Sequence, residues 1–172
     1  MFKKNHPIDL CDTALDCTFA TVTKLPKEQF LKLIELGPLV SIDLIVNCKG
    51  KFLIGLRKNK PAQDFWFVPG GRIFKNETLK DAFYRLTLAE LNMPLKIDNA
   101  SFLGVYQHFY GDSVISEGLS THYIVLAYEL RLQSMDFFLT NKQHKSWQWL
   151  TQEEIVNSEK VHFYSKAYFS RE

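Results

Sequence analysis

The chain has 172 residues, of which 46% are hydrophobic and 14% aromatic, a composition typical of a globular domain that excludes an intrinsically disordered protein. The formal net charge is only +2 and no block of like charges occurs, so nothing favours binding to nucleic acid or to a membrane surface. The three cysteines lack metal-ligand spacing, and no signal peptide or bilayer-spanning stretch is found, so we expect reduced thiols in a cytoplasmic protein.

Residues 1–23 show no sustained hydrophobic period, and we predict an N-terminal extension of unknown role followed by one domain over residues 24–172. Helices are predicted from helical period and from start and stop residues over residues 27–36, from Thr78 toward Met93, and over residues 162–169. Strands are predicted from short apolar runs between turn signals at residues 39–48, 52–57, 65–68, 103–109, 122–132 and 147–150. Strands interleaved with a few helices predict an α+β fold with a mixed sheet and flanking helices.

The helix that follows Thr78 carries one apolar stripe with an acid in it. At about 100° per residue, the stripe consists of Leu79, Ala82, Phe83, Leu86 and Met93. Glu90 falls within this stripe, and a buried carboxylate costs several kcal/mol unless a cation or hydrogen-bond donors meet it. Two interpretations stay open: Glu90 reaches water at the rim of the stripe, or it faces a bound cation.

The loop before this helix has the residues of a phosphate site. Pro69, Gly70 and Gly71 form a turn signal, and the two glycines let the backbone approach a ligand closely. Arg72 offers a guanidinium fork for phosphate, and the helix N-terminus lies just beyond it. The loop and the helix together therefore indicate binding of a phosphorylated ligand with a cation.

The spacing of four residues in this region resembles the Nudix box, and these residues are Gly71, Glu77, Arg85 and Glu90. Three positions depart from the box: Leu86 and Ala89 replace glutamates, and Asn92 replaces a glycine. Asn92 is a mild change because asparagine tolerates the left-handed conformation that ends helices. Leu86 and Ala89 remove carboxylates with which ordinary Nudix enzymes hold several divalent ions.

One branch of the Nudix family, the GDP-mannose mannosyl hydrolases, is similar to this chain because it also lacks these carboxylates of the box. The similarity runs from about Pro38 to the C-terminus and includes residues 57, 61–63, 66–72, 85–87, 89–91, 107–110, 121–123 and 143–144. The resemblance implies a Nudix-type α/β/α sandwich with a mixed β-sheet and a central loop-helix motif. It also implies a homodimer that takes a small nucleotide sugar and binds neither nucleic acid nor membrane.

The resemblance implies one Mg²⁺ ion, which Mn²⁺ can replace, held by the Gly70 carbonyl oxygen, the Glu90 carboxylate and the Gln143 side chain. It implies further that Arg57 and Arg72 lie at the diphosphate, that Asp43 and His108 lie at the sugar, and that Tyr123 contacts either group. His144 matches the general base of the branch, since an imidazole with a pKa of about 6.5 can accept a proton from water. A base in the polar stretch of residues 140–146 would be exposed on a loop and would become ordered when substrate binds.

Taken singly, these residues have ordinary alternatives that the sequence leaves open. Asp43 can be an outward residue of a half-buried strand, and Tyr123 can be a core aromatic. Arg57 can be solvated, Gln143 can be a loop amide, and His144 can be exposed without a function.

We expect the branch reaction, in which water attacks the anomeric carbon of GDP-mannose and releases GDP and the sugar with inversion, and GDP-glucose stays open as a substrate. One alternative is a nucleotide or nucleotide-sugar pyrophosphohydrolase that attacks phosphorus. Another is a non-catalytic domain that binds nucleotide sugars.

Overall fold

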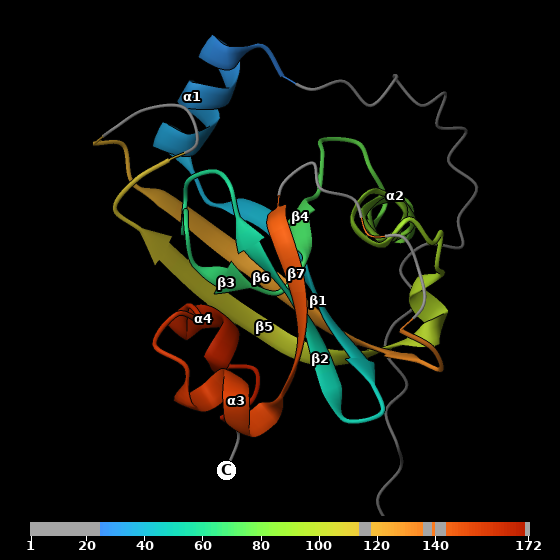
Figure 1. Cartoon of the computed structure of the whole chain (residues 1–172). Helices are drawn as coiled ribbons and strands as arrows, with labels where there is room; N and C mark the ends of the chain where they lie inside the picture. The colour runs from blue at the N-terminus through green and yellow to red at the C-terminus, as the bar shows by residue number, and fades with distance from the viewer. Residues whose placement is uncertain (1–24, 114–117, 136–138, 140–143, 171–172) are drawn as a thin grey trace, which may run out of the picture.

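A computed structural model describes residues 25–113, 118–135, 139 and 144–170. A mixed sheet lies between α2 on one face and α3 with α4 on the other, while α1 lies at one end (Figure 1). The helices are α1 Lys27–Leu36, α2 Leu79–Leu91, α3 Gln152–Asn157 and α4 Phe163–Lys166, with a 3₁₀ turn η1 at Ile97–Asn99. The strands are β1 Leu39–Cys48, β2 Lys51–Arg57, β3 Trp66–Phe67, β4 Gly70–Arg72, β5 Ala100–Tyr110, β6 Thr121–Leu132 and β7 His144–Thr151. The predicted α+β class is confirmed.

Strand β1 is the centre of the sheet. The strand order is β3-β2-β1-β6-β5, with β4 pairing with β1 and β7 pairing with β2. β1 runs parallel to β6 and antiparallel to β2 and β4. In this register Asp43 lies opposite Gly70 of β4 and Ala127 of β6. Asp43 is therefore held at the middle of the sheet, next to the loop that leads into α2.

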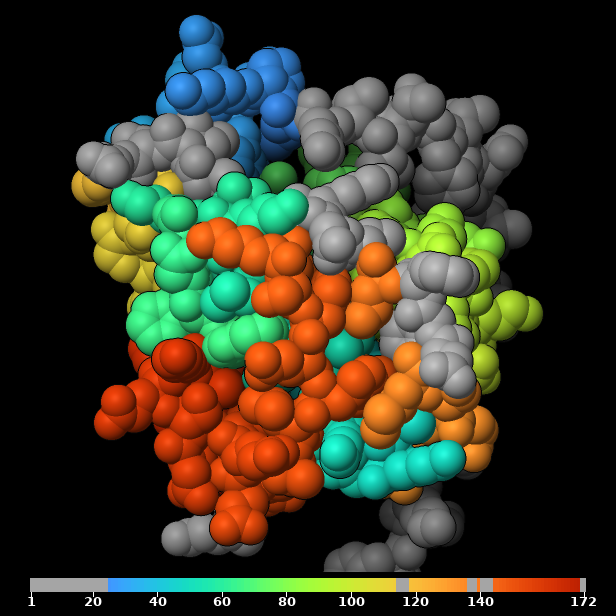
Figure 2. Space-filling model, viewed as in Figure 1, coloured from blue at the N-terminus to red at the C-terminus, as the bar shows by residue number. Residues whose placement is uncertain are grey.

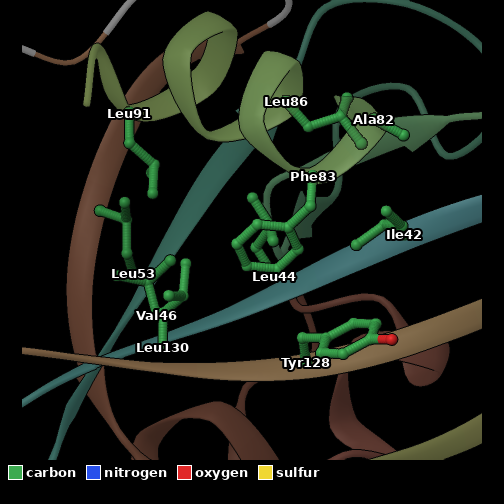
Figure 3. Close-up of a cluster of buried hydrophobic side chains, with 10 residues drawn as sticks. All are labelled: Ile42, Leu44, Val46, Leu53, Ala82, Phe83, Leu86, Leu91, Tyr128 and Leu130. Atoms are coloured by element: carbon green, nitrogen blue, oxygen red, sulfur yellow. The ribbon is translucent and has the colours of Figure 1, made fainter. Parts of the chain in front are cut away.

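Alternate residues of β1 enter two separate cores, as the period of two in a strand requires. Ile42, Leu44 and Val46 pack in the core beneath α2, where Phe83 and Leu86 of the helix point toward them (Figure 3). Ile45 belongs to the core on the other face, which also contains Ile155, Val161, Tyr168 and Phe169 from the C-terminal part of the chain. The two cores give the molecule its three layers.

The ends of α2 match the sequence prediction. The Thr78 hydroxyl accepts a hydrogen bond of 3.1 Å from the backbone N–H of Asp81, which satisfies a free donor of the first turn. Asn92 ends the helix in the left-handed conformation, with φ 55° and ψ 25°. Of the side chains between them, Ala82, Phe83, Leu86 and Glu90 are buried, so the predicted stripe faces the core.

Three local expectations need correction. Residues 70–72 form a strand on β1 instead of a turn, since Gly70 has no Cβ and can lie against the Ile42 carbonyl oxygen, where a Cβ would clash. The last helix is shorter than predicted, because only Phe163–Lys166 is α-helical. β7 is longer than predicted and begins at His144. The predicted extension over residues 1–23 lies outside the described residues, and within the described ranges no helix has the length and apolarity to cross a membrane.

Candidate active site

An ion pair fixes the loop that leads into α2. The Arg85 guanidinium donates hydrogen bonds of 2.5 and 2.8 Å to the two carboxylate oxygens of Glu77, whose side chain is only 3% exposed. Arg85 also donates to the backbone carbonyl of Arg72 at 2.8 Å, and Glu77 accepts from the backbone N–H of Phe74 at 2.9 Å. The charges of both side chains are thus used to hold β4 and the loop against the helix.

Helix α2 lies close to β4 because Gly71 has no side chain. A Cβ at Gly71 would be 2.7 Å from Leu86 Cδ2. Leu86 is 2% exposed and belongs to the core beneath α2, so the position where the box has a glutamate is filled by a hydrocarbon side chain. Glu90, one helical turn later on the same stripe, is the carboxylate that remains there.

Glu90 is buried, 2% exposed, and lies beside His144, whose Nδ1 is 3.4 Å from its Oε2. This excludes the interpretation in which Glu90 simply reaches water at the rim of the stripe. Neither ring nitrogen of His144 has a hydrogen-bond partner among the described residues, although both atoms are buried. A buried carboxylate and a buried imidazole with unused nitrogens are typical of a functional site.

The prediction that His144 is exposed on a loop is wrong. His144 is the first residue of β7 and is 1% exposed. Its ring fits against β2 because Gly55 has no side chain: a Cβ at Gly55 would lie 2.6 Å from His144 Cγ and 2.8 Å from Trp147 Cζ3. The His144 and Trp147 rings lie side by side, with centroids 4.2 Å apart. Packing against Gly55 and Trp147 therefore holds the His144 ring in place.

The residues around Glu90 fit a hard divalent cation better than a soft one. Within the described ranges no group of three or more His, Cys, Asp or Glu side chains gathers as a metal cluster. The single buried carboxylate of Glu90 fits magnesium, which takes one or two carboxylates and completes its shell with water and phosphate. The predicted ligand Gln143 lies outside the described residues.

On the opposite face of the sheet, Asp43 takes part in a buried hydrogen-bond chain. The Tyr168 hydroxyl donates to Asp43 Oδ2 at 2.7 Å and lies 3.2 Å from His108 Nε2. Burial raises the pKa of Asp43 to about 7, while the hydrogen bond from Tyr168 and the charge of Arg57 lower that pKa. Asp43 is thus not the outward residue that one interpretation of the strand allowed.

His108 lies directly opposite Tyr123 in the β5–β6 register. Its ring stacks on that of Tyr164, with centroids 4.1 Å apart and an angle of 18° between the planes. Burial lowers the pKa of His108 to about 3, and the charge of His162 acts in the same direction. The imidazole of His108 is therefore neutral at physiological pH, when it can both donate and accept one hydrogen bond.

Two arginines flank Tyr123. Burial raises the pKa of Tyr123, whereas the charges of Arg72 and Arg57 lower that pKa, so both cations lie within electrostatic reach of the phenol. The Arg57 Nε–H donates to the Pro61 carbonyl at 2.8 Å, and the Arg72 guanidinium lies 3.8 Å from the centre of the Phe30 ring on α1. These contacts orient the two guanidinium groups, and a guanidinium has five N–H donors, of which the contact of Arg57 with Pro61 uses one.

The predicted site residues fall into two groups on opposite faces of the sheet, and strand pairing links the groups. One group consists of Asp43, Arg57, Arg72, His108 and Tyr123, and the other of Glu90 and His144. In the pairing of neighbouring strands, Arg57 of β2 is the partner of His144 of β7, and Asp43 of β1 is the partner of Gly70 of β4. Gly70 is at the start of the predicted phosphate loop, so this loop begins beside Asp43.

Sequence reasoning missed the contribution of the C-terminal residues to this site. Tyr168, Tyr164 and His162 surround His108, and they come from a segment that was predicted only as a helix. Tyr168 and Asp43 are 125 positions apart, and a single hydrogen bond over that separation leaves no periodic pattern. The aromatic density of the segment was the one available signal.

Comparison with known proteins identifies one family. The family model described as NUDIX domain matches residues 37–171. The low-salt glycan biosynthesis protein Agl8 of Haloferax volcanii is 43% identical over 110 residues, which are 64% of this chain and 69% of Agl8.

Solved structures share the fold at low identity. The MutT NUDIX hydrolase of Burkholderia pseudomallei superimposes with a TM-score of 0.62 at 21% identity, over 77% of this chain and 96% of its own. The MutT protein of Methanosarcina mazei Go1 gives a TM-score of 0.64 at 19% identity, over 79% and 94%. The NUDIX domain of Shewanella oneidensis NrtR, solved with ADP ribose, gives 0.59 at 13% identity, over 84% and 96%.

Proposed function

The chain belongs to the Nudix hydrolase family, and from this premise we propose that it hydrolyses GDP-mannose to GDP and free mannose with one Mg²⁺ ion. The observation that carries the proposal is the buried pair of Glu90 on α2 and His144 on β7, with 3.4 Å between Glu90 Oε2 and His144 Nδ1, while Leu86 fills another position of the box. One carboxylate fits one ion, and an imidazole beside it fits a base. The similarity to Agl8, named for glycan biosynthesis, supports a nucleotide sugar as the substrate.

In this proposal the Glu90 carboxylate, the Gly70 carbonyl oxygen and the Gln143 side chain would hold the ion, and Mn²⁺ can replace Mg²⁺. The bound ion would neutralise diphosphate charge and make GDP a better leaving group. Arg57, Arg72 and Tyr123 would bind the same diphosphate through the donors described above.

His144 is the proposed general base. If its Nδ1 carries the proton toward the Glu90 carboxylate, Nε2 has a free lone pair that can accept a proton from water. The water oxygen then forms a bond to the anomeric carbon, the bond between that carbon and the diphosphate oxygen breaks, and GDP leaves with the electron pair. The configuration at the anomeric carbon inverts, as in an inverting glycosidase. Asp43 and His108 are proposed to bind the sugar.

The products decide between this proposal and attack at phosphorus. Incubation of the full chain with GDP-mannose and Mg²⁺ in ¹⁸O-labelled water should give unlabelled GDP and labelled mannose. Recovery of GMP and mannose 1-phosphate would mean a pyrophosphohydrolase, and binding without turnover would mean a nucleotide-sugar-binding domain. NMR of the first sugar released, taken before mutarotation, should show the anomer opposite to that of the substrate. GDP-glucose in the same assay determines which sugar is preferred.

The edge of the sheet supports the proposed homodimer. In the order of the described strands β5 is an edge, and Phe102, Val105 and Phe109 on it are 54%, 60% and 58% exposed. Exposed apolar side chains on one strand promote association, so covering them with a second copy would stabilise the protein. Analytical ultracentrifugation should give the mass of a dimer, and Val105→Lys should shift it to the monomer. A monomeric wild-type protein would contradict this assignment.

A further inference from the structure

Tyr168 connects the two residues that we place at the sugar. It follows α4, is 5% exposed, and its hydroxyl lies 2.7 Å from Asp43 Oδ2 and 3.2 Å from His108 Nε2. Asp43 belongs to β1 and His108 to β5, so the hydroxyl joins two strands that are not neighbours in the sheet. One side chain from the C-terminal segment thus connects the two residues of the proposed sugar site.

Several contacts fix the segment that carries Tyr168. The Tyr164 hydroxyl donates to the Phe109 carbonyl at 2.9 Å and accepts from the Phe109 N–H at 2.5 Å. The Ser165 hydroxyl accepts from the backbone N–H of Val68 at 3.1 Å, and both atoms are buried. In the space-filling view the C-terminal residues, coloured red, lie against the green residues near β3 (Figure 2). The segment that carries Tyr168 is therefore anchored to Phe109 of β5 and to the backbone of Val68.

The donors and acceptors of Tyr168, Asp43 and His108 determine where their protons lie. A tyrosine hydroxyl has one proton and can also accept, whereas a carboxylate only accepts. With Asp43 ionised, the hydroxyl proton is directed at Asp43 and the hydroxyl oxygen accepts from His108, which places the imidazole proton on Nε2. Nδ1 of the neutral ring is left as an acceptor, and a sugar hydroxyl is a donor that would suit it.

We propose that Tyr168 is a positioning residue, which holds Asp43 and His108 in one hydrogen-bonded unit and fixes His108 as the Nε2–H tautomer. This proposal rests on the proposed function only because it takes the sugar as the ligand of this unit. Burial lowers the pKa of His108 to about 3, which supports a neutral ring. Tyr168 itself is not placed against the reacting atoms.

The test removes the hydroxyl and keeps the ring. Tyr168→Phe should preserve the edge-on contact with the Tyr106 ring, whose centroid is 4.7 Å away. At a pH where Asp43 is ionised, long-range ¹H–¹⁵N spectra of the wild-type chain should show His108 as the Nε2–H tautomer, and the variant should show a mixture. For GDP-mannose, kcat/KM should fall by about 10- to 100-fold, the size expected for one hydrogen bond to a charged group. The affinity for GDP alone should stay unchanged.

Tyr128→Phe is the matched control, because Tyr128 is a buried tyrosine that packs against Phe83 beneath α2. It should leave both the tautomer of His108 and kcat/KM as in the wild type. A wild-type His108 with its proton on Nδ1 would overturn the proposal, and this spectrum needs no variant to fold. Tyr168→Phe with wild-type kinetics, or with an equal loss of GDP affinity, would overturn it as well. If the wild-type chain does not hydrolyse GDP-mannose, the proposed function fails while the spectra still decide the role of Tyr168.

Discussion

Replacing Asp43 with asparagine should change how stability depends on pH. The carboxyl is buried at the centre of the sheet, where it accepts a hydrogen bond from Tyr168. Burial raises its pKa from 3.8 to about 7, against the opposing effects of Tyr168 and Arg57. Asparagine has nearly the same shape, and its amide oxygen can accept the same hydrogen bond without titrating.

The direction of this pH dependence follows from whether the Asp43 carboxylate binds its proton more tightly in the folded or in the unfolded state. A folded-state pKa above the unfolded value means that protonation of Asp43 stabilises the fold, and this stabilisation is lost as pH rises through about 7. At pH 5, about two units below the folded pKa and above the unfolded one, it amounts to about 3 kcal/mol, at 1.36 kcal/mol per unit. At pH 8 it is close to zero. The wild-type chain should therefore gain about 3 kcal/mol over Asp43→Asn between pH 8 and pH 5.

The wild type and Asp43→Asn must be compared because two histidines change the free energy of unfolding with pH in the opposite direction. Burial lowers the pKa of His108 to about 3 and that of His162 to about 4, so their contribution is present above pH 6.5 and is lost as pH falls. Subtracting the variant from the wild type cancels this contribution. Urea unfolding at pH 5 and at pH 8 gives the four free energies. A difference between the two proteins that does not change with pH would refute the reasoning.

Four further outcomes are expected. Gly55→Ala should destabilise the chain by about 1–3 kcal/mol in urea and lower turnover, because the new Cβ meets the His144 ring; full activity would contradict this packing. Arg85→Met should cost about 3 kcal/mol, since it leaves the nearly buried Glu77 carboxylate unpaired, and adding Glu77→Gln should recover part of the loss in the same assay. His144→Ala should lower kcat by about 100- to 10,000-fold and leave the calorimetric affinities for Mg²⁺ and GDP nearly unchanged, whereas a comparable loss of GDP affinity would show that the role is misassigned. Removal of divalent ions with EDTA should abolish turnover, and added Mg²⁺ should restore it; activity that survives EDTA would exclude the metal.

Local sequence patterns predicted most of the fold. β1 and α1 have the predicted bounds, because a run of β-branched residues and a helical period each act over a few neighbouring positions. The left-handed Asn92 after α2 was also predicted, since caps depend on side chains within one turn. The position of Glu90 in the buried stripe followed from the same helical period.

What the sequence could not predict depends on contacts between distant segments. His144 is buried because Gly55, on another strand, leaves space for its ring, and nothing near His144 in the sequence indicates this. Residues 70–72 form a strand only because β1 offers a partner. The bridge from Tyr168 to Asp43 and His108 requires three segments to meet, so no single stretch carries the pattern.

The bridge by Tyr168 has a consequence for biosynthesis. Translation produces Asp43 first and its hydrogen-bond donor 125 residues later, so a growing chain lacks this hydrogen bond until residues 161–169 have left the ribosome. Up to that moment the buried acid has no phenol to anchor it, and the second core lacks part of its packing. The completion of the second core and of the proposed sugar site should thus coincide late in synthesis.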